Sequence, residues 1–255
     1  MSRWLALALS CTACGRFGFG ADPDAGGHGS DVGSAASDAG HDGTTGPSCA
    51  GFDICDQFED PVLSSVWDTF GDVTHATLAH RGSGAVHFAV PAVAAGGMGG
   101  ALIRDTMTLA GGTAPEFWLR IWVRFGAHAD VQNHLELLSA DEFTGGGLGD
   151  YVFAEADVTA LYSQFDNMTA ELPIAIPLNT WTCLIWHVQP NAGTMTLNGD
   201  LGSSSYSGML NGSPPITVID IGPNLDPTNV AVDQPAFEVW LDDVIIHHAA
   251  VTCAD

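Results

Sequence analysis

From residue 49 onward, short apolar runs alternate with glycine, proline, asparagine and aspartate. Apolar residues recur at every second position in residues 86–90, 117–125 and 135–137. A period of two is typical of a β-strand with one buried face. Residues 181–188, 218–221 and 237–247 are rich in β-branched and aromatic residues and are also expected to be strands. No segment has the length and periodicity of an amphipathic helix.

Many short strands separated by turn residues predict an all-β fold, an antiparallel two-sheet β-sandwich or jelly roll. One such domain uses roughly 200 residues, and residues 49–255 supply that length. We therefore expect a single β-sandwich domain over residues 49–255.

The first residues have the composition of an export signal. Arg3 precedes an apolar run at residues 4–9, and the small residues Thr12 and Ala13 stand before Cys14. This arrangement resembles the lipobox of bacterial lipoproteins, and residues 13–19 are similar to the start of many lipoproteins from myxobacteria and their relatives. The resemblance implies a signal peptide over residues 1–13, lipidation of Cys14, and an exported protein anchored by lipid at the outer membrane or cell surface. An ordinary signal peptide cut elsewhere is the alternative.

The segment that follows the export signal differs from it in composition. Residues 20–48 consist mainly of Gly, Ala, Asp, Ser, Thr and His. Such a segment buries too little surface to offset its ordering entropy, so residues 14–48 are expected to be the lipidated N-terminus and a disordered linker. No later segment approaches the ~20 apolar residues of a transmembrane helix. Lipid is therefore the only membrane attachment that we expect.

The charge balance is strongly acidic. Six arginines and no lysine stand against 30 Asp and Glu residues, giving a formal net charge of -24. A phosphate backbone repels such a protein, so the composition disfavours binding to nucleic acid. The same carboxylates could serve as calcium ligands.

Four cysteines remain once Cys11 leaves with the signal and Cys14 carries lipid: Cys49, Cys55, Cys183 and Cys253. An even number in an exported chain predicts two disulfides. Of the three possible pairings, we slightly favour Cys49–Cys55 with Cys183–Cys253. The rival pairing joins Cys49 or Cys55 to Cys253 and so ties the two ends of the domain together.

A series of motifs resembles a known superfamily. In order they are CDQFED at residues 55–60, Trp67, GSGAVH at 82–87, FWLR at 117–120, WTCLIW at 181–186 with Asn198-Gly199 behind it, and WLDDV at 240–244. They are similar to the concanavalin A-like lectin/glucanase superfamily, in its laminin G-like form on bacterial surface lipoproteins, from about residue 50 to the end. The resemblance implies a jelly roll whose concave sheet binds or cuts glycans.

Strand parity separates a core face from a polar face in residues 117–125. The odd positions are all apolar, whereas the even positions are Trp118, Arg120, Trp122 and Arg124. In the next strand, His134 and Glu136 alternate with leucines. If the two strands are neighbours, one face carries a set of residues that can stack on sugar rings and bond their hydroxyls: Trp118, Arg120, Trp122, Arg124, His134 and Glu136. This set is our predicted site for a carbohydrate or another partner. Coverage of the face by loops is the alternative.

The sequence gives less support to an enzyme. Glucanases of the superfamily carry Glu-x-Asp-x-x-Glu, and the nearest match, EADVTA at residues 155–160, is broken at Ala160. A divergent polysaccharide lyase needs arginine with histidine or tyrosine, and Arg120, Arg124, Gln132, His134, Tyr151 and Tyr162 supply those types. No catalytic residue is assigned. A structural envelope protein without a small ligand is the third alternative.

Two groups could hold a metal ion. Glu59 and Asp60 follow the first strand, and Asp242 and Asp243 lie in the last. If the terminal strands pair, these carboxylates converge, and their hard oxygens suit a structural calcium ion. By contrast, the adjacent residues at 247 and 248 should point their rings to opposite faces of a strand. We interpret that histidine pair as surface residues and expect no transition-metal site there.

Overall fold

The computed structural model describes residues 49–105, 116–126, 133, 135–141, 152–156, 161–165, 168–172, 176–189, 194–207, 218–225 and 230–255. The predictions on the signal peptide, Cys14, the linker and His134 fall outside these residues. Within them, no helix is long and apolar enough to cross a membrane.

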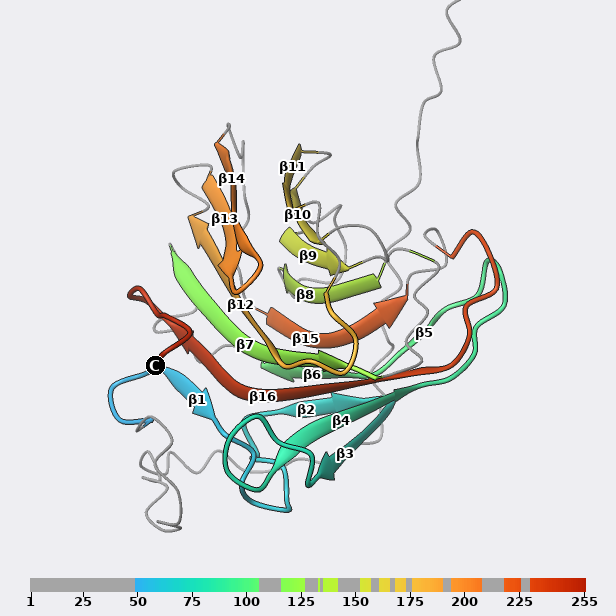
Figure 1. Cartoon of the computed structure of the whole chain (residues 1–255), viewed down its shortest axis with the longest axis horizontal. Helices are drawn as coiled ribbons and strands as arrows, with labels where there is room; N and C mark the ends of the chain where they lie inside the picture. The colour runs from blue at the N-terminus through green and yellow to red at the C-terminus, as the bar shows by residue number, and fades with distance from the viewer. Residues whose placement is uncertain are drawn as a thin grey trace, which may run out of the picture. The chain divides into compact units, whose positions relative to one another are not determined.

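The described residues form two antiparallel sheets of eight strands each (Figure 1). Sheet A runs in the order β14 (Gly202–Ser207), β13 (Thr194–Gly199), β12 (Thr182–Gln189), β7 (Phe117–Phe125), β16 (Phe237–His247), β4 (Ala85–Val90) and β3 (Asp72–Ala76), with β1 (Ile54–Asp56) paired to β16. Sheet B runs in the order β11 (Met168–Leu172), β10 (Leu161–Phe165), β9 (Val152–Ala156), β8 (Leu135–Asp141), β15 (Val218–Leu225), β6 (Leu102–Asp105) and β2 (Asp68–Phe70), with β5 (Gly99–Gly100) paired to β15. The predicted all-β sandwich is confirmed.

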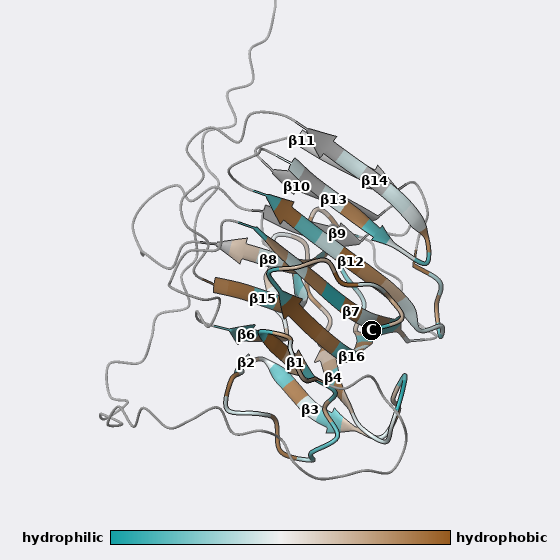
Figure 2. Ribbon diagram, turned by 90° about the vertical axis from the view of Figure 1, so that its left-hand side faces the viewer, coloured by the Kyte–Doolittle hydropathy of each residue, from teal (hydrophilic) through white to brown (hydrophobic). Residues whose placement is uncertain are grey.

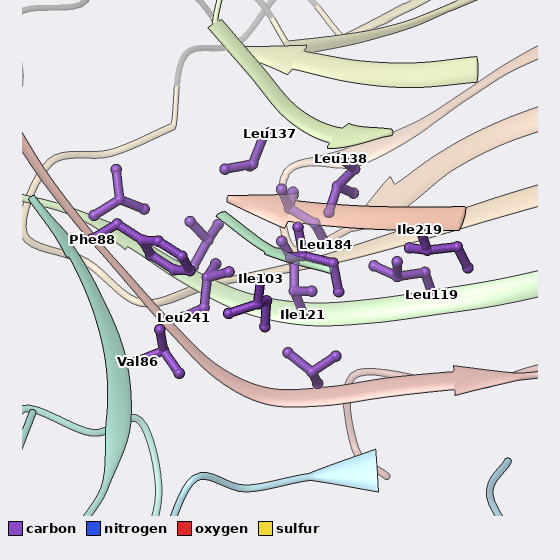
Figure 3. Packing of buried hydrophobic residues seen from close by; sticks show 14 of the residues in the cluster. Val86, Phe88, Ile103, Leu119, Ile121, Leu137, Leu138, Leu184, Ile219 and Leu241 are labelled. Atoms are coloured by element: carbon purple, nitrogen blue, oxygen red, sulfur yellow. The ribbon is translucent and has the colours of Figure 1, made fainter. Parts of the chain in front are cut away.

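The core lies between the two sheets. Leu119 and Ile121 of β7 are fully buried, and they belong to the same cluster as Ile219 of β15 and Leu138 of β8 (Figure 3). In Figure 2, β15 and β16 carry long hydrophobic stretches, whereas the edge strand β3 carries hydrophilic ones. Burial of this apolar surface is the main favourable contribution to folding.

Strand β16 changes parity at a bulge. Its pairing with β7 shifts between Asp242 and Ile245, and Asp243 has a left-handed φ of 50°. Before the bulge Leu241 points into the core, whereas after it Val244 does. A bulge inserts one extra residue and so re-aims the side chains that follow. Here it places Ile245 on the outer face of sheet A.

A smaller apolar cluster covers part of that outer face. It joins Cys183, Ile185, Ile245 and Val251, with Trp118 and Trp122 packed against it. The disulfide Cys183–Cys253 fastens the C-terminal segment to β12, and Cys49–Cys55 joins the segment before β1 to β1 itself. The favoured cysteine pairing is thus confirmed.

Candidate functional site

The division of β7 into two faces is as predicted. The five odd-numbered residues from Phe117 to Phe125 are at most 3% exposed and lie in the core. Trp118, Trp122 and Arg124 are half-buried on the outer face of sheet A. The alternation in the sequence therefore identified the inward and outward residues of this strand correctly.

The chain's own C-terminus covers the middle of this outer face. Arg120 is 1% exposed. Its Nε and Nη2 donate to the carbonyl oxygen of Asp243 at 3.2 and 2.7 Å, and its Nη1 donates to the carbonyl oxygen of Asp255. Arg81 Nη1 donates to the same Asp255 oxygen at 3.2 Å. The expectation that Arg120 faces a ligand is therefore wrong, because its guanidinium holds the C-terminal segment against the sheet.

The tryptophans of the outer face are stacked on other side chains of the protein. Trp122 lies on His80 with ring centroids 3.6 Å apart, and Trp118 lies on His187 at 3.8 Å. Trp240 lies 4.8 Å from His87 of β4 and 5.1 Å from the guanidinium of Arg124 of β7. Since β16 runs between those two strands, the Trp240 ring contacts a side chain from each neighbouring strand.

Glu136 does not share a face with these residues, which corrects a central expectation. Strand β8 pairs with β9 and β15 in sheet B, whereas β7 pairs with β12 and β16 in sheet A. Consecutive strands often pair, but here the chain crosses from one sheet to the other between them. The predicted six-residue face is therefore divided between two sheets, and its His134 lies outside the described residues.

The register of sheet B brings together a row of polar residues that the sequence did not reveal. Asn224 of β15 is opposite Glu136, which is opposite Glu155 of β9. Glu155 is in turn opposite Tyr162 of β10, and Tyr162 is opposite Glu171 of β11. Leu135, next to Glu136, belongs to the core, whereas Glu136 is half-buried, so the Glu136 side chain lies on the outer face of sheet B.

The residues of the broken glucanase motif and of the lyase alternative are only partly brought together. Glu155 of the broken glucanase motif lies in β9, and Asp157 and Ala160 lie outside the described residues. Of the lyase set, Arg124 is in sheet A and Tyr162 in sheet B. Gln132, His134 and Tyr151 lie outside the described residues. The described members of the lyase set therefore do not form one site.

Of the predicted calcium ligands, the two near the first strand lie at different places. Both oxygens of Glu59 accept from the backbone N–H of Ser83, at 3.0 and 2.9 Å, and one also accepts from its hydroxyl at 2.7 Å. A side chain at Gly82, whose φ is +66°, would collide with the Glu59 carboxylate. Asp60 is exposed and accepts from Val62 N–H at 2.9 Å. Glu59 therefore shapes the loop at residues 79–84, and Asp60 does not.

The other two predicted calcium ligands are buried at the opposite end of that loop. Asp242 Oδ2 accepts from the backbone N–H groups of His80 and Arg81 at 2.7 and 3.1 Å. Burial and the adjacent Asp243 carboxylate raise the pKa of Asp242 to about 8. Asp243 Oδ2 lies 3.0 Å from His80 Nδ1, and its buried Oδ1 has no hydrogen-bond partner. Such an orphaned oxygen fits a cation, although among the described residues no group of three potential ligands converges here.

The two adjacent histidines behave differently from the prediction. Strand β16 ends at His247, so the alternation of a strand does not extend to His248. Both Nδ1 atoms lie within 3.0 Å of one carboxylate oxygen of Asp53. The expectation that the two rings point to opposite faces is wrong.

No family model and no curated protein matches the sequence. Among solved structures, the cellulose-induced protein Cip1 is similar, with a TM-score of 0.57 and 18% identity over 78% of this chain and 99% of that one. The binding domain of botulinum neurotoxin serotype C1 is also similar, with a TM-score of 0.51 and 12% identity over 72% of this chain and 44% of that one. A botulinum neurotoxin type C structure, described as interacting with two ganglioside molecules, has a TM-score of 0.50 and 10% identity, over 72% of this chain and 43% of that one. The chain thus spans less than half the length of the toxin chains. At these identities the likeness shows the fold.

Proposed function

We propose that the protein is a glycan-binding module on the cell surface, and that the glycan lies across β15, β8, β9, β10 and β11 on the outer face of sheet B. The observation that carries the proposal is the row Asn224, Glu136, Glu155, Tyr162 and Glu171. Carboxylates accept hydrogen bonds from sugar hydroxyls, amides both accept and donate them, and an aromatic residue gives a surface for a sugar ring. Five adjacent strands spaced by about 4.8 Å make the row roughly 19 Å long.

Sheet A is the competing location, and its outer face is less suited to a ligand. Arg120 is buried under the C-terminal segment, and the rings of Trp118 and Trp122 are stacked on His187 and His80. Arg124 remains accessible at one end, where Nη2 donates to Asn179 Oδ1 at 2.8 Å. A glycan on this sheet would have to use that end alone.

Lipid anchoring and export are part of the proposal. Two disulfides are typical of exported proteins. The interaction of a botulinum neurotoxin type C with gangliosides is consistent with a glycan partner on this fold. Lipidation rests on the sequence around Cys14. It is tested by fatty-acid labelling, in which Cys14→Ser should abolish the label.

The function is tested with the full chain, purified in detergent, on a glycan array. The best ligand is then titrated against Tyr162→Ala and against Trp118→Ala as a matched loss of an aromatic ring from the other sheet. Loss of an anchor aromatic commonly costs ~2 kcal/mol, or roughly thirtyfold in affinity. We expect that loss for Tyr162→Ala and full binding for Trp118→Ala. The opposite pattern would place the site on sheet A, and an array without any ligand would favour a structural envelope protein.

Glycan cleavage is a second candidate function, favoured by the register of Glu136 with Glu155. Directly opposite residues in antiparallel strands have Cβ atoms about 4.5–5.5 Å apart. Retaining glycosidases place their two carboxyl groups about 5–5.5 Å apart. Release of reducing ends from the bound glycan, abolished by Glu155→Gln with binding kept, would establish it. Binding without release by the unmodified chain would rule it out.

Calcium is the proposed structural cation, with Asp243 and Asp242 as ligands. The support is the buried, unpartnered Oδ1 of Asp243 beside a second buried carboxylate. Calcium prefers six to eight oxygens, so backbone carbonyls or water would complete the shell. When bound, the ion would favour the ionised form of both adjacent carboxyl groups.

A further inference from the structure

Where β1 pairs with the end of β16, one carboxylate oxygen lies within hydrogen-bond distance of three nitrogen atoms. Asp53 Oδ2 lies 3.0 Å from His247 Nδ1 and 2.6 Å from His248 Nδ1. It also accepts from the backbone N–H of His248 at 2.9 Å. Among the described residues, these three side chains are the group whose potential metal ligands all lie within 4.8 Å of one another.

The fold explains why residues almost 200 positions apart converge. Strand β1 pairs with the end of β16, with Ile54 opposite Ile246, so the preceding Asp53 is placed beside His247. The chain bends after β16, which lets the next residue, His248, turn its ring to the same side. Phe52 packs edge-on against the His247 ring with centroids 5.3 Å apart. The position of the His247 ring is therefore fixed by its neighbours.

We propose that Asp53, His247 and His248 bind a divalent transition-metal ion, with zinc as the expected occupant. Two imidazole nitrogens and one carboxylate oxygen are a donor set that zinc takes in proteins, whereas calcium and magnesium prefer oxygen alone. Ligand atoms held about 2.0–2.2 Å from zinc in a tetrahedron lie roughly 3.3–3.5 Å apart. The two distances from Asp53 Oδ2 to the histidine Nδ1 atoms, 3.0 and 2.6 Å, therefore have to lengthen by less than about 1 Å to admit the ion.

The exposure of the group suits a metal ion. Zinc would displace the Nδ1 protons of the two rings, which would move to Nε2 or to solvent. The His248 side chain is 70% exposed, so water can fill the remaining coordination position.

Such an ion would fasten the start of the domain to its last strand. The disulfide Cys49–Cys55 encloses Asp53 in its loop, so the ion would join that loop to the end of β16. A ligand that binds only the folded state raises the unfolding temperature. Zinc should therefore act as a third cross-link in the domain, in addition to the two disulfides.

The test uses the full chain in detergent, stripped with EDTA, and zinc chloride as the probe. We expect one zinc ion per chain by calorimetry. A free zinc concentration one hundred times Kd should raise the unfolding temperature by about 5 °C or more. His248→Ala removes a mostly exposed ligand and Asp53→Asn weakens the central one, so both should bind at least about tenfold more weakly. Cobalt should give the visible absorption of a tetrahedral site in the unmodified chain but not in these two variants.

His187→Ala is the matched control, because His187 also pairs with a carboxylate, Glu116, at 2.8 Å on the same sheet. It should bind zinc like the unmodified chain. Ions held elsewhere, for example by His28 or His41 in the linker, contribute equally to all variants. The proposal is overturned if the unmodified chain gains no stability from zinc, or if His248→Ala and Asp53→Asn bind it with unchanged affinity.

Discussion

The guanidinium of Arg120 and the carbonyl oxygen of Asp243 are joined by two hydrogen bonds, of 3.2 and 2.7 Å, beneath the C-terminal segment. The bulge that gives Asp243 its left-handed conformation interrupts the pairing of β16 with β7 at this point. Its carbonyl is therefore available to the arginine. Arg120 therefore links three parts of the fold: the outer face of sheet A, the bulge in β16 and the C-terminal segment.

Arg120→Ala should destabilise the domain strongly. It removes both guanidinium donors to the Asp243 carbonyl and one of the two arginine donors to the Asp255 carbonyl, and it leaves a buried space; losses of this kind cost about 3 kcal/mol or more. Urea unfolding of the unmodified chain and the variant measures the difference. Arg124→Ala, in which a half-buried arginine of the same strand is removed, is the control and should cost less than about 1 kcal/mol. Equal costs would mean that Arg120 has no special structural role.

The two disulfides should differ in their contribution. Cys183–Cys253 spans 70 residues and Cys49–Cys55 spans 6. In the chain-entropy model these loops correspond to about 4 and about 2 kcal/mol. Replacing each pair by serine and measuring the free energy of unfolding tests this order. A larger loss for the short loop would indicate that contacts, not chain entropy, dominate.

Stability should depend on pH through Asp242. The pKa of this buried carboxyl is raised to about 8, against about 3.9 in an unfolded chain. Between those values the folded state holds one more proton than the unfolded state. The contribution of Asp242 is therefore full below pH ~4 and falls as pH rises toward 8, by at most about 1.4 kcal/mol per unit.

Asp242→Asn isolates this effect, because asparagine does not titrate. The free energy of unfolding, measured between pH 5 and 8, should fall more steeply for the unmodified chain than for the variant. Parallel curves would mean that Asp242 is ionised in the folded state throughout this range.

Calcium should stabilise the chain through Asp243. Millimolar calcium is expected to raise the unfolding temperature by a few degrees, since a ligand of the folded state shifts the equilibrium toward it. Asp243→Asn should abolish the shift. Asp60→Asn is the control, because Asp60 is exposed and bonds only a local backbone group in the described contacts. An undiminished shift in Asp243→Asn would exclude this site.

Local features of the fold could be predicted from the sequence, whereas strand pairing could not. The alternation in residues 117–125 identifies the core face of β7 because each side chain's direction depends on its own strand. That β7 and β8 lie in different sheets depends on which distant strands complete each sheet. The bulge at Asp243 and the end of β16 at His247 also shift parity without any clear mark in the sequence.

The candidate sites show the same limit. Glu136, Glu155 and Tyr162 are unremarkable in the sequence because they lie in three strands, and only the register of sheet B aligns them. Asp53 and His248 are almost 200 residues apart and converge because β1 pairs with β16. Residues that act together across strands become visible once the sheet order is known.

Trp122→Ala distinguishes the two sheets as locations of the glycan. The Trp122 ring is stacked on His80 at 3.6 Å and packs against the apolar cluster around Cys183. Its removal should cost about 2 kcal/mol or more in unfolding free energy, because the cluster loses a large half-buried ring. Glycan affinity per folded molecule should stay unchanged, and Arg124→Ala should weaken acidic glycans no more than neutral ones. A stable Trp122→Ala that no longer binds, or a selective loss of acidic glycans in Arg124→Ala, would return the site to the outer face of sheet A.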